Sequence, residues 1–268
     1  MSNKIGIVGC AGRMGRMLTD VIGRTDNCEV FGGTELRGSP NLGKDLGELA
    51  GIGTIGVKVG DDPLALFEAC DVVIDFSVPE ATLNHAKLAA KTGCSLVVGT
   101  TGMTHEQVAE LEAATTTTSI VFARNMSLGV NLLMSIVEQV AASLDEDYDI
   151  EVVEMHHRHK VDSPSGTALA LGEAAAAGRG VDLDKVADKV RDGIIGARKR
   201  GDIGFATLRG GDVVGDHSVI FAADGERIEL GHRASNREVF ARGAVKAANW
   251  LQGKENGFYD MRDVLGLK

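Results

Sequence analysis

Short apolar runs alternate with helical periodicity along the first half of the chain. Apolar runs bounded by turn residues predict buried strands, and apolar residues at intervals of three and four predict amphipathic helices. We therefore expect strands over residues 5–8, 29–33, 72–76, 95–98 and 120–123, and helices over residues 13–23, 81–91 and 104–113. Thr104 is suited to cap the last of these helices. Regular alternation of strand and helix indicates a parallel sheet with helices on both faces.

The pattern changes after Asn125. We expect helices over residues 130–144, 167–177 and 239–251 and a strand over residues 150–155. Between residues 203 and 233 the chain is predicted to form strands, interrupted by a Gly-Gly pair at 210–211 and an Asp-Gly pair at 224–225. The Asp-Gly pair is typical of a hairpin turn. Short connections of this kind indicate an antiparallel or mixed sheet.

Together these patterns predict an α/β chain with two domains. The first is expected to be a Rossmann-type, doubly wound parallel sheet over residues 1–127. The second is expected to be an α+β domain with a mixed or antiparallel sheet over residues 128–236, which would bind the substrate. Residues 237–268 are expected to form a C-terminal helix that returns to the first domain.

Charge and composition narrow the class of partner. Lys and Arg number 28 against 38 Asp and Glu, so the formal net charge is −10. This balance argues against a nucleic acid or an anionic membrane as partner, and an anionic small molecule would need a local basic pocket. The chain has 4 Cys and no C-x-x-C pair, so we expect reduced, mostly buried thiols. With no signal segment or membrane-length apolar run, these features predict a cytoplasmic protein.

A glycine-rich turn follows the first predicted strand. Its glycines, at 9, 12 and 15, are spaced G-x-x-G-x-x-G rather than in the commoner G-x-G-x-x-G order. The first two would allow a tight turn and the close approach of a pyrophosphate, and Gly15 would let the helix pack on the strand. A turn without a ligand is the alternative, but the strand, turn and helix context favours a nucleotide. The candidate contacts are Gly9, Cys10, Ala11, Gly12, Arg13 and Met14.

Glu35 follows the second predicted strand, 20 residues after Gly15. A carboxylate at this distance is suited to the ribose hydroxyls of NAD, and a solvated loop acid is the alternative. Arg37 is suited to the 2′-phosphate of NADP. An acid and a base so close together predict that both NADH and NADPH are used.

Two further loops follow predicted strands at the edge of the sheet where ligands bind in doubly wound folds. Both are candidates to hold the nicotinamide and its ribose. Their residues are Gly99, Thr100 and Thr101, and Ala123, Arg124, Asn125 and Met126.

The segment from Glu154 to Ala168, EMHHRHKVDSPSGTA, has the densest chemistry. Lys160 can pair with a carboxylate or give up a proton. Gly166 and Thr167 present backbone N–H groups at a predicted helix start, which suit a second carboxylate. The segment therefore favours a small dicarboxylate as substrate. A histidine metal site and a solvated basic strand end are the alternatives, although no H-E-x-x-H motif or Cys partner supports a metal.

This segment resembles the substrate motif of the 4-hydroxy-tetrahydrodipicolinate reductase family, the dihydrodipicolinate reductases of bacterial and plant lysine synthesis. The resemblance extends to G-x-x-G-R-M-G at the start, G-T-T-G at 99–102, R-N-M-S-L-G-V-N at 124–131 and G-F-A-T-L-R-G-G-D-V-V-G-D-H at 204–217, and so covers essentially the whole chain. The chain departs from many members in having Ser163 in place of Ala and Met126 in place of Phe. Leu36 also separates Glu35 from Arg37, whereas in some members an Arg directly follows the acid.

The resemblance implies a homotetrameric enzyme that reduces a cyclic imine-type dicarboxylate with NADPH or NADH. It implies that His156 and Lys160 are catalytic, and that the candidate residues of the glycine turn and the loops above bind the cofactor. The implied substrate-binding residues are His157, Lys160, Ser165, Gly166 and Thr167. The residues leave three alternatives open: another NAD(P)H-dependent imine or amino-acid dehydrogenase, a non-catalytic NAD(P)H sensor, and a metal-dependent hydrolase.

Overall fold

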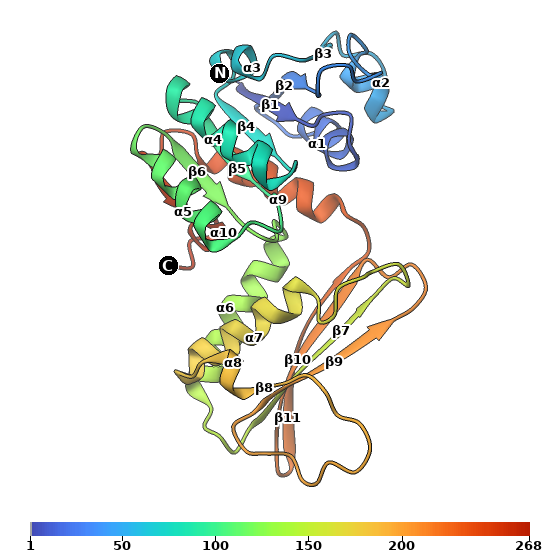
Figure 1. Cartoon of the computed structure of the whole chain (residues 1–268), viewed down its shortest axis with the longest axis vertical. Coiled ribbons are helices and arrows are strands. Elements are labelled where there is room, and N and C mark those ends of the chain that lie inside the picture. Colours follow the sequence, from blue (N-terminus) through green and yellow to red (C-terminus); the bar gives the residue numbers. More distant parts are fainter. Residues whose placement is uncertain (1) are drawn as a thin grey trace. The chain divides into compact units, whose positions relative to one another are not determined.

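The computed structural model describes residues 2–268, which divide into two compact units (Figure 1). The first unit is formed by the chain up to Ser127 together with Glu238–Gly266. The second is formed by Leu128–Arg237. The chain therefore leaves the first unit once and returns to it near its C-terminal end.

A parallel sheet lies at the centre of the first unit. Within residues 2–268 its strands follow the order β12 (Gly257–Tyr259), β6 (Ser119–Phe122), β5 (Ser95–Val98), β4 (Val72–Asp75), β1 (Asn3–Val8), β2 (Cys28–Thr34) and β3 (Val59–Gly60). Every neighbouring pair is parallel. The chain winds outward from β1 in one direction and from β4 in the other, so the predicted Rossmann-type, doubly wound sheet is confirmed.

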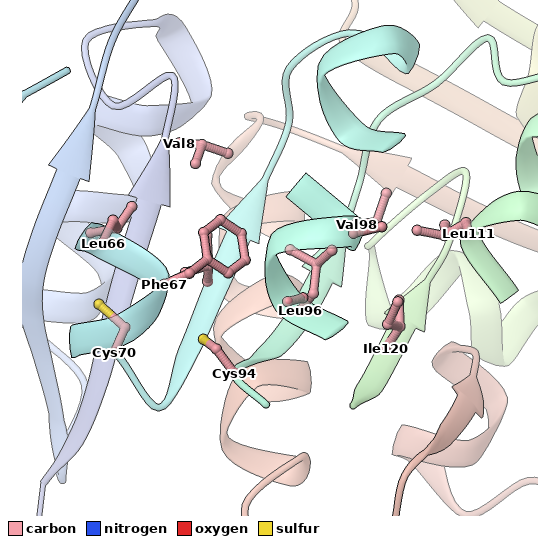
Figure 2. Close-up of a cluster of buried hydrophobic side chains, with 12 residues drawn as sticks. Val8, Leu66, Phe67, Cys70, Cys94, Leu96, Val98, Leu111 and Ile120 are labelled. Atoms are coloured by element: carbon pink, nitrogen blue, oxygen red, sulfur yellow. The ribbon is translucent and has the colours of Figure 1, made fainter. Parts of the chain in front are cut away.

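Helices cover both faces of this sheet, as Figure 1 shows. On one face α1 (Arg13–Gly23) packs against α9 (Glu238–Trp250), and on the other lie α3 (Pro63–Ala69), α4 (Pro79–Thr92) and α5 (His105–Ala113). Figure 2 shows the buried cluster under the second set, which extends from Phe67 and Leu96 to Leu111 beside Val98 and Ile120. In β4, β5 and β6 the side chains on both faces are largely buried, so these strands have short apolar sequences, and this is why they were predictable.

The longer elements of this unit agree with the predicted ranges, but several short ones were not predicted. Thr104 caps α5 through a capping box with Gln107, as expected from the sequence. The elements not predicted are α2 (Leu46–Ala50), β3, α3, the 3-10 turn η1 (Ala114–Thr116), β12 and α10 (Met261–Leu265). They are too short to show a hydrophobic period. The expectation of only a helix after residue 237 was therefore incomplete, because β12 adds a strand beside β6.

The second unit contains a mixed sheet. Within the described part of the chain its order is β11 (Glu226–Ala234), β10 (Gly215–Ala223), β7 (Asp149–His156), β9 (Ile203–Arg209) and β8 (Ala187–Asp188). β10 is antiparallel to both β11 and β7, whereas β9 is parallel to both β7 and β8. The hairpin predicted at 224–225 is confirmed, since Ala223 lies opposite Glu226. The Gly-Gly pair at 210–211 does not form a hairpin, because β7 lies between β9 and β10.

Two helices cover one face of the second sheet: α6 (Leu128–Ser143) and α7 (Gly166–Arg179). They pack closely because Gly178 has no side chain; a Cβ there would lie 2.2 Å from the carbonyl oxygen of Glu138. A short helix, α8 (Leu183–Val186), follows α7. Among residues 2–268 we find no helix with both the length and the apolar character that a membrane span requires.

Candidate active site

The glycine turn lies at the carboxyl end of β1, where the chain enters α1. Gly9 has φ of +66°, in the left-handed region that favours glycine. Its amide donates to the carbonyl oxygen of Thr34 at 2.9 Å, and the Gly12 amide donates to the Gly9 carbonyl oxygen at 3.0 Å. Gly12 is the N-cap of α1 and provides no side chain to bind the first amides of the helix. The turn thus leaves the positive end of α1 available to an anion.

Gly15 brings α1 close to this turn. A Cβ at Gly15 would lie 2.5 Å from the carbonyl oxygens of both Gly9 and Cys10, so only glycine fits without a shift of the backbone. The Cys10 side chain is buried beneath the turn. Burial, followed by the charge of Glu35, raises the pKa of this thiol to about 12, so Cys10 is a neutral packing group.

The candidate ribose-binding residues follow β2. The Glu35 carboxylate accepts a hydrogen bond from the Ala11 amide at 2.8 Å, so the structure brings this acid directly to the glycine turn. Arg37 is exposed, as is Leu36, whose side chain is 82% accessible. Both an acid and a base are therefore present at the end of β2.

A buried polar cluster holds the loop after β5, and the sequence analysis did not identify it. The Thr100 hydroxyl lies 2.8 Å from that of Thr82 and donates to the Asp75 carboxylate at 3.4 Å. Asp75 is fully buried, and its other oxygen lies 2.8 Å from His85 Nδ1. Burial alone would raise the pKa of Asp75, but hydrogen bonds from His85 and from the Ser77 amide hold it below its usual value. A charged residue at the end of an otherwise apolar strand was the available signal.

The loop after β6 contains both exposed and buried candidates. Arg124 is exposed and Asn125 is half-buried, whereas Met126 is only 1% accessible. The Met126 backbone packs against α9, where a Cβ at Gly243 would lie 1.7 Å from the Met126 carbonyl oxygen. Met126 therefore helps to fix the path of the loop from the interior of the unit.

His156 lies at the end of β7 in a buried network. Its Nδ1 atom is 2.6 Å from the carboxylate of Glu154, and its ring stands edge-on to that of His217 with 5.0 Å between the centroids. Burial lowers the pKa of His156, and its hydrogen bond to Glu154 only partly offsets this effect. Burial and the nearby His156 lower the pKa of His217 to about 4. Both rings are therefore neutral at neutral pH.

Lys160 lies four residues after His156 in the sequence, and its charge acts on the same histidines. Its Nζ atom is 2.7 Å from Asp162 Oδ1, and its side chain is 20% accessible. Its positive charge contributes to the lowered pKa of both His156 and His217. The predicted cation and the predicted histidine are thus brought together within the second unit.

Ser165 caps the start of α7. Its hydroxyl oxygen accepts the Ala168 amide hydrogen at 3.1 Å and lies 3.0 Å from Nε2 of His217. A Cβ added at Gly166 would meet nothing within 4 Å, so this helix start is open to a small ligand. Three of the candidate substrate residues, Ser165, Gly166 and Thr167, therefore form the start of α7.

The remaining histidines of the segment are more accessible. His157 is half-buried and His159 is exposed, and their ring centroids are 6.3 Å apart. Among residues 2–268 no group of three or more His, Cys, Asp and Glu side chains is arranged to hold a metal ion. Four residues of the candidate site in the second unit were not identified individually from the sequence. They are Glu154, Arg209, Gly215 and His217.

Comparisons with known proteins identify the family of the chain. The family model described as the N-terminus of dihydrodipicolinate reductase matches residues 3–126, and the model of its C-terminus matches residues 129–265. The 4-hydroxy-tetrahydrodipicolinate reductase of Ruegeria pomeroyi is 60% identical over 97% of both chains. That of Dinoroseobacter shibae is 59% identical over the full length of both.

The fold is also similar to that of a solved structure. Dipicolinate-bound dihydrodipicolinate reductase from Paenisporosarcina sp. TG-14 has a TM-score of 0.77 at 22% identity, with 97% of this chain and 98% of that chain covered. An amine dehydrogenase from Mycobacterium smegmatis is more distant, with a TM-score of 0.59 over 96% of this chain and 94% of that one. The two family models together account for nearly the whole sequence, and the chain belongs to the dihydrodipicolinate reductase family.

Proposed function

We propose that this protein is a 4-hydroxy-tetrahydrodipicolinate reductase, which uses NADPH or NADH to make tetrahydrodipicolinate in the diaminopimelate route to lysine. The observation that carries the proposal is the arrangement of residues 154–168, where a buried histidine, a lysine and an open helix start occur together. The reductases of Ruegeria pomeroyi and Dinoroseobacter shibae, which share more than half of their residues with this chain, support the assignment.

The second unit is proposed to bind the dicarboxylate substrate. Gly166 and Thr167 offer backbone N–H groups at the positive end of α7, which stabilise one carboxylate. Ser165 fixes the turn by accepting a hydrogen bond from the Ala168 amide. His157, which directly follows β7, is proposed to bind the substrate as well. Lys160 then supplies the proton that the ring requires, and its charge offsets the second carboxylate. His156, as a neutral ring, is proposed to accept a proton during the reaction.

The first unit is proposed to bind the dinucleotide, with its pyrophosphate at the start of α1. NADPH or NADH, when bound, supplies the hydride. The pyrophosphate contacts are residues 9–14, and the nicotinamide and its ribose are held by residues 99–101 and 123–126. Glu35 is proposed to accept hydrogen bonds from ribose hydroxyls, and the exposed Arg37 to donate to a 2′-phosphate, so we propose that both cofactors are used.

We also propose a cytoplasmic homotetramer that assembles through the five-stranded sheet of the second unit. This part rests on the family resemblance and on the face of that sheet opposite α6 and α7, where Leu208 is exposed. Sedimentation equilibrium of the purified protein tests the tetramer, and a mass of one or two chains would exclude it.

The decisive experiment is coupled turnover. The unstable substrate is generated in place from pyruvate and aspartate semialdehyde by the preceding synthase, and loss of NADPH or NADH is followed by absorbance. Oxidation that depends on the synthase is expected with both cofactors. Binding of both cofactors without oxidation would refute the substrate assignment and favour an NAD(P)H sensor, whereas oxidation with other imines or oxo acids alone would favour another dehydrogenase.

Lys160→Ala is expected to lose most of its turnover and to bind NADH normally, because Lys160 lies in the second unit and contributes the proton. Lys185→Ala is the matched control: Lys185 also pairs with an aspartate, Asp182, at 3.5 Å, but is 80% accessible. His156→Ala is expected to lose less turnover than the double variant with Lys160→Ala. An unchanged kcat in Lys160→Ala would remove that residue from the mechanism.

A further inference from the structure

Glu154 is a buried carboxylate that binds four hydrogen-bond donors. Arg209 donates to both of its oxygens at 2.8 and 3.0 Å, the amide of Ser165 donates at 3.0 Å, and His156 Nδ1 lies at 2.6 Å. The Glu154 side chain is 1% accessible. Burial would raise the pKa of Glu154, but the bonds from Arg209, His156 and Ser165 hold it below its usual value. The group is therefore a fully bonded carboxylate ion.

Strand register explains why these groups meet. On β7, Glu154 and His156 are two residues apart and therefore project from the same face. On the neighbouring β9, Arg209 is paired with His156, and on β10, His217 is paired with Glu154. This face is the one covered by α7, whose N-cap Ser165 bonds both to Glu154 and to His217.

The carboxylate determines which nitrogen of His156 carries the proton. A carboxylate accepts but does not donate, so the 2.6 Å contact requires a proton on Nδ1. In the neutral ring Nε2 is then left with its lone pair. The space around Nε2 is kept by Gly215, where a Cβ would lie 3.0 Å from Nε2. His156 is thus held in one tautomer, and its Nε2 atom faces the position of Gly215, which has no side chain.

Arg209 also connects this carboxylate to the lysine of the segment. Its guanidinium donates to the backbone carbonyl oxygen of Asp162 at 2.6 Å, and the side chain of Asp162 pairs with Lys160. One guanidinium therefore restrains both the strand end that carries His156 and the loop that carries Lys160.

We propose that Glu154, clamped by Arg209, is a positioning residue that fixes the tautomer of His156 and the first turn of α7 in one arrangement. The proposal rests on the proposed reductase function for its catalytic consequence, but not for its statement about His156. A carboxylate with a purely structural role would stabilise the second unit without any influence on proton transfer. The two roles differ in the tautomer of His156 and in the pH dependence of turnover.

Glu154→Gln tests this directly, because it removes the charge and keeps the shape. An amide cannot accept from Arg209 with both of its terminal atoms and also accept the proton of His156, so its N–H₂ group is expected to donate to Nδ1 and move the ring proton to Nε2. We expect kcat to fall by about 10–100-fold, as for other residues that orient a reacting side chain. The cofactor affinity, measured by titration with NADH, is expected to be unchanged.

The matched control is Glu151→Gln. Glu151 lies on the same strand, where it binds Arg191 through two bonds of 2.8 Å and Arg198 through one of 2.9 Å. It projects from the opposite face, away from His156. The substitution Glu151→Gln removes a comparable arginine–carboxylate interaction, so its effect on stability serves as the reference. We expect Glu151→Gln to retain wild-type kcat.

The tautomer is read from ¹⁵N chemical shifts of the histidine rings, with His156 assigned by comparison with His156→Gln. We expect a protonated Nδ1 in the parent protein and a protonated Nε2 in Glu154→Gln, whether or not the protein reduces the proposed substrate. Burial, Lys160 and Arg209 lower the pKa of His156, whereas Glu154 raises it. His217 on β10 and His232, paired with it on β11, also project from this face. The limb of the pH profile due to His156 is therefore expected to move to lower pH in Glu154→Gln.

Two further variants keep the test decisive if Glu154→Gln folds poorly. Glu154→Asp retains a carboxylate and should restore part of kcat and the Nδ1 tautomer. Arg209→Lys keeps the charge but loses the two-bond clamp, and should show a smaller loss of the same kind. An unchanged tautomer and pH profile in Glu154→Gln, with only a loss of stability like that of Glu151→Gln, would overturn the proposal. If Glu154→Gln does not fold, loss of the Nδ1 tautomer in Glu154→Asp, or a wild-type kcat and pH profile in Arg209→Lys, would overturn it instead. Loss of reductase activity in the parent protein alone would instead refute the proposed function.

Discussion

Replacement of Gly15 by alanine should weaken both the first unit and its affinity for a dinucleotide. The new Cβ would lie 2.5 Å from two carbonyl oxygens and from Cys10 Cα, whereas carbon atoms pack at about 3.5–4.0 Å. Since all three neighbours are backbone atoms, α1 and the glycine turn must separate by about 1 Å. Overpacking of this kind costs about 1–3 kcal/mol, or about 2–4 °C in Tm for each kcal/mol.

The same shift moves the first amides of α1 away from a bound pyrophosphate. Loss of one hydrogen bond to a charged group costs about 1.5–3 kcal/mol, so the Kd for NADH should rise about 10–100-fold. The affinity is measured by calorimetric titration without substrate and the Tm by differential scanning calorimetry, so neither depends on turnover.

Gly23→Ala in the same helix is the control. A Cβ there would lie 3.6 Å from Ile52, an ordinary contact, and the helix gains up to about 1 kcal/mol from alanine. We expect Gly23→Ala to bind NADH normally with an unchanged or higher Tm. If Gly15→Ala behaves in the same way, the close approach of α1 to the turn is not required and the reasoning is wrong.

Two other substitutions test further parts of the first unit. Gly243→Ala should lower the denaturation midpoint markedly, because its Cβ would lie 1.7 Å from the Met126 carbonyl oxygen and α9 would have to move; an unchanged midpoint in urea would contradict this close packing. Asp45 accepts hydrogen bonds from four backbone amides, and although burial would raise its pKa, these bonds hold it below its ordinary 3.8. Its carboxylate therefore stabilises the fold above that pH and the contribution is lost as the pH falls through the lowered pKa. Asp45→Asn should thus unfold more easily than the parent at neutral pH but equally easily in strong acid, and a difference independent of pH would argue against the carboxylate.

The sheet of the first unit was predictable because its information is local. β4, β5 and β6 are continuous apolar runs, and each is separated from the next by one helix of readable length. Elements such as β3 and β12 contain two or three residues, which is too few to show a hydrophobic pattern. α3 was missed although it begins with Asp62 as N-cap and Pro63 at its first position, which is a recognisable start signal.

The candidate substrate segment was predicted for the same reason, since its histidines, lysine and helix start are adjacent in the chain. Arg209 could not be assigned in this way, because it lies 55 residues from Glu154 and is brought to it by the register of β7 and β9. The burial of Glu154, by contrast, could be predicted from the sequence. Ile150 and Val152 occupy alternate buried positions of β7, which places Glu154 and His156 on the same buried face. A buried acid requires a partner, although the sequence does not say which one.

Both units contain a buried carboxylate whose partners include a histidine and a loop amide. Asp75 at the end of β4 and Glu154 near the end of β7 are both buried carboxylates, and each lies within 2.8 Å of the Nδ1 atom of a histidine. Each also accepts the amide of a following loop residue, Ser77 in one case and Ser165 in the other. A carboxylate can accept several hydrogen bonds at once, so a single acid can fix a ring and a loop together where two neutral side chains would be needed. The added clamp of Arg209 makes the arrangement around Glu154 the more constrained of the two, because displacement of either oxygen would leave a charge unpaired in the interior. For this reason we place the positioning role at Glu154 rather than at the more exposed groups of the same segment.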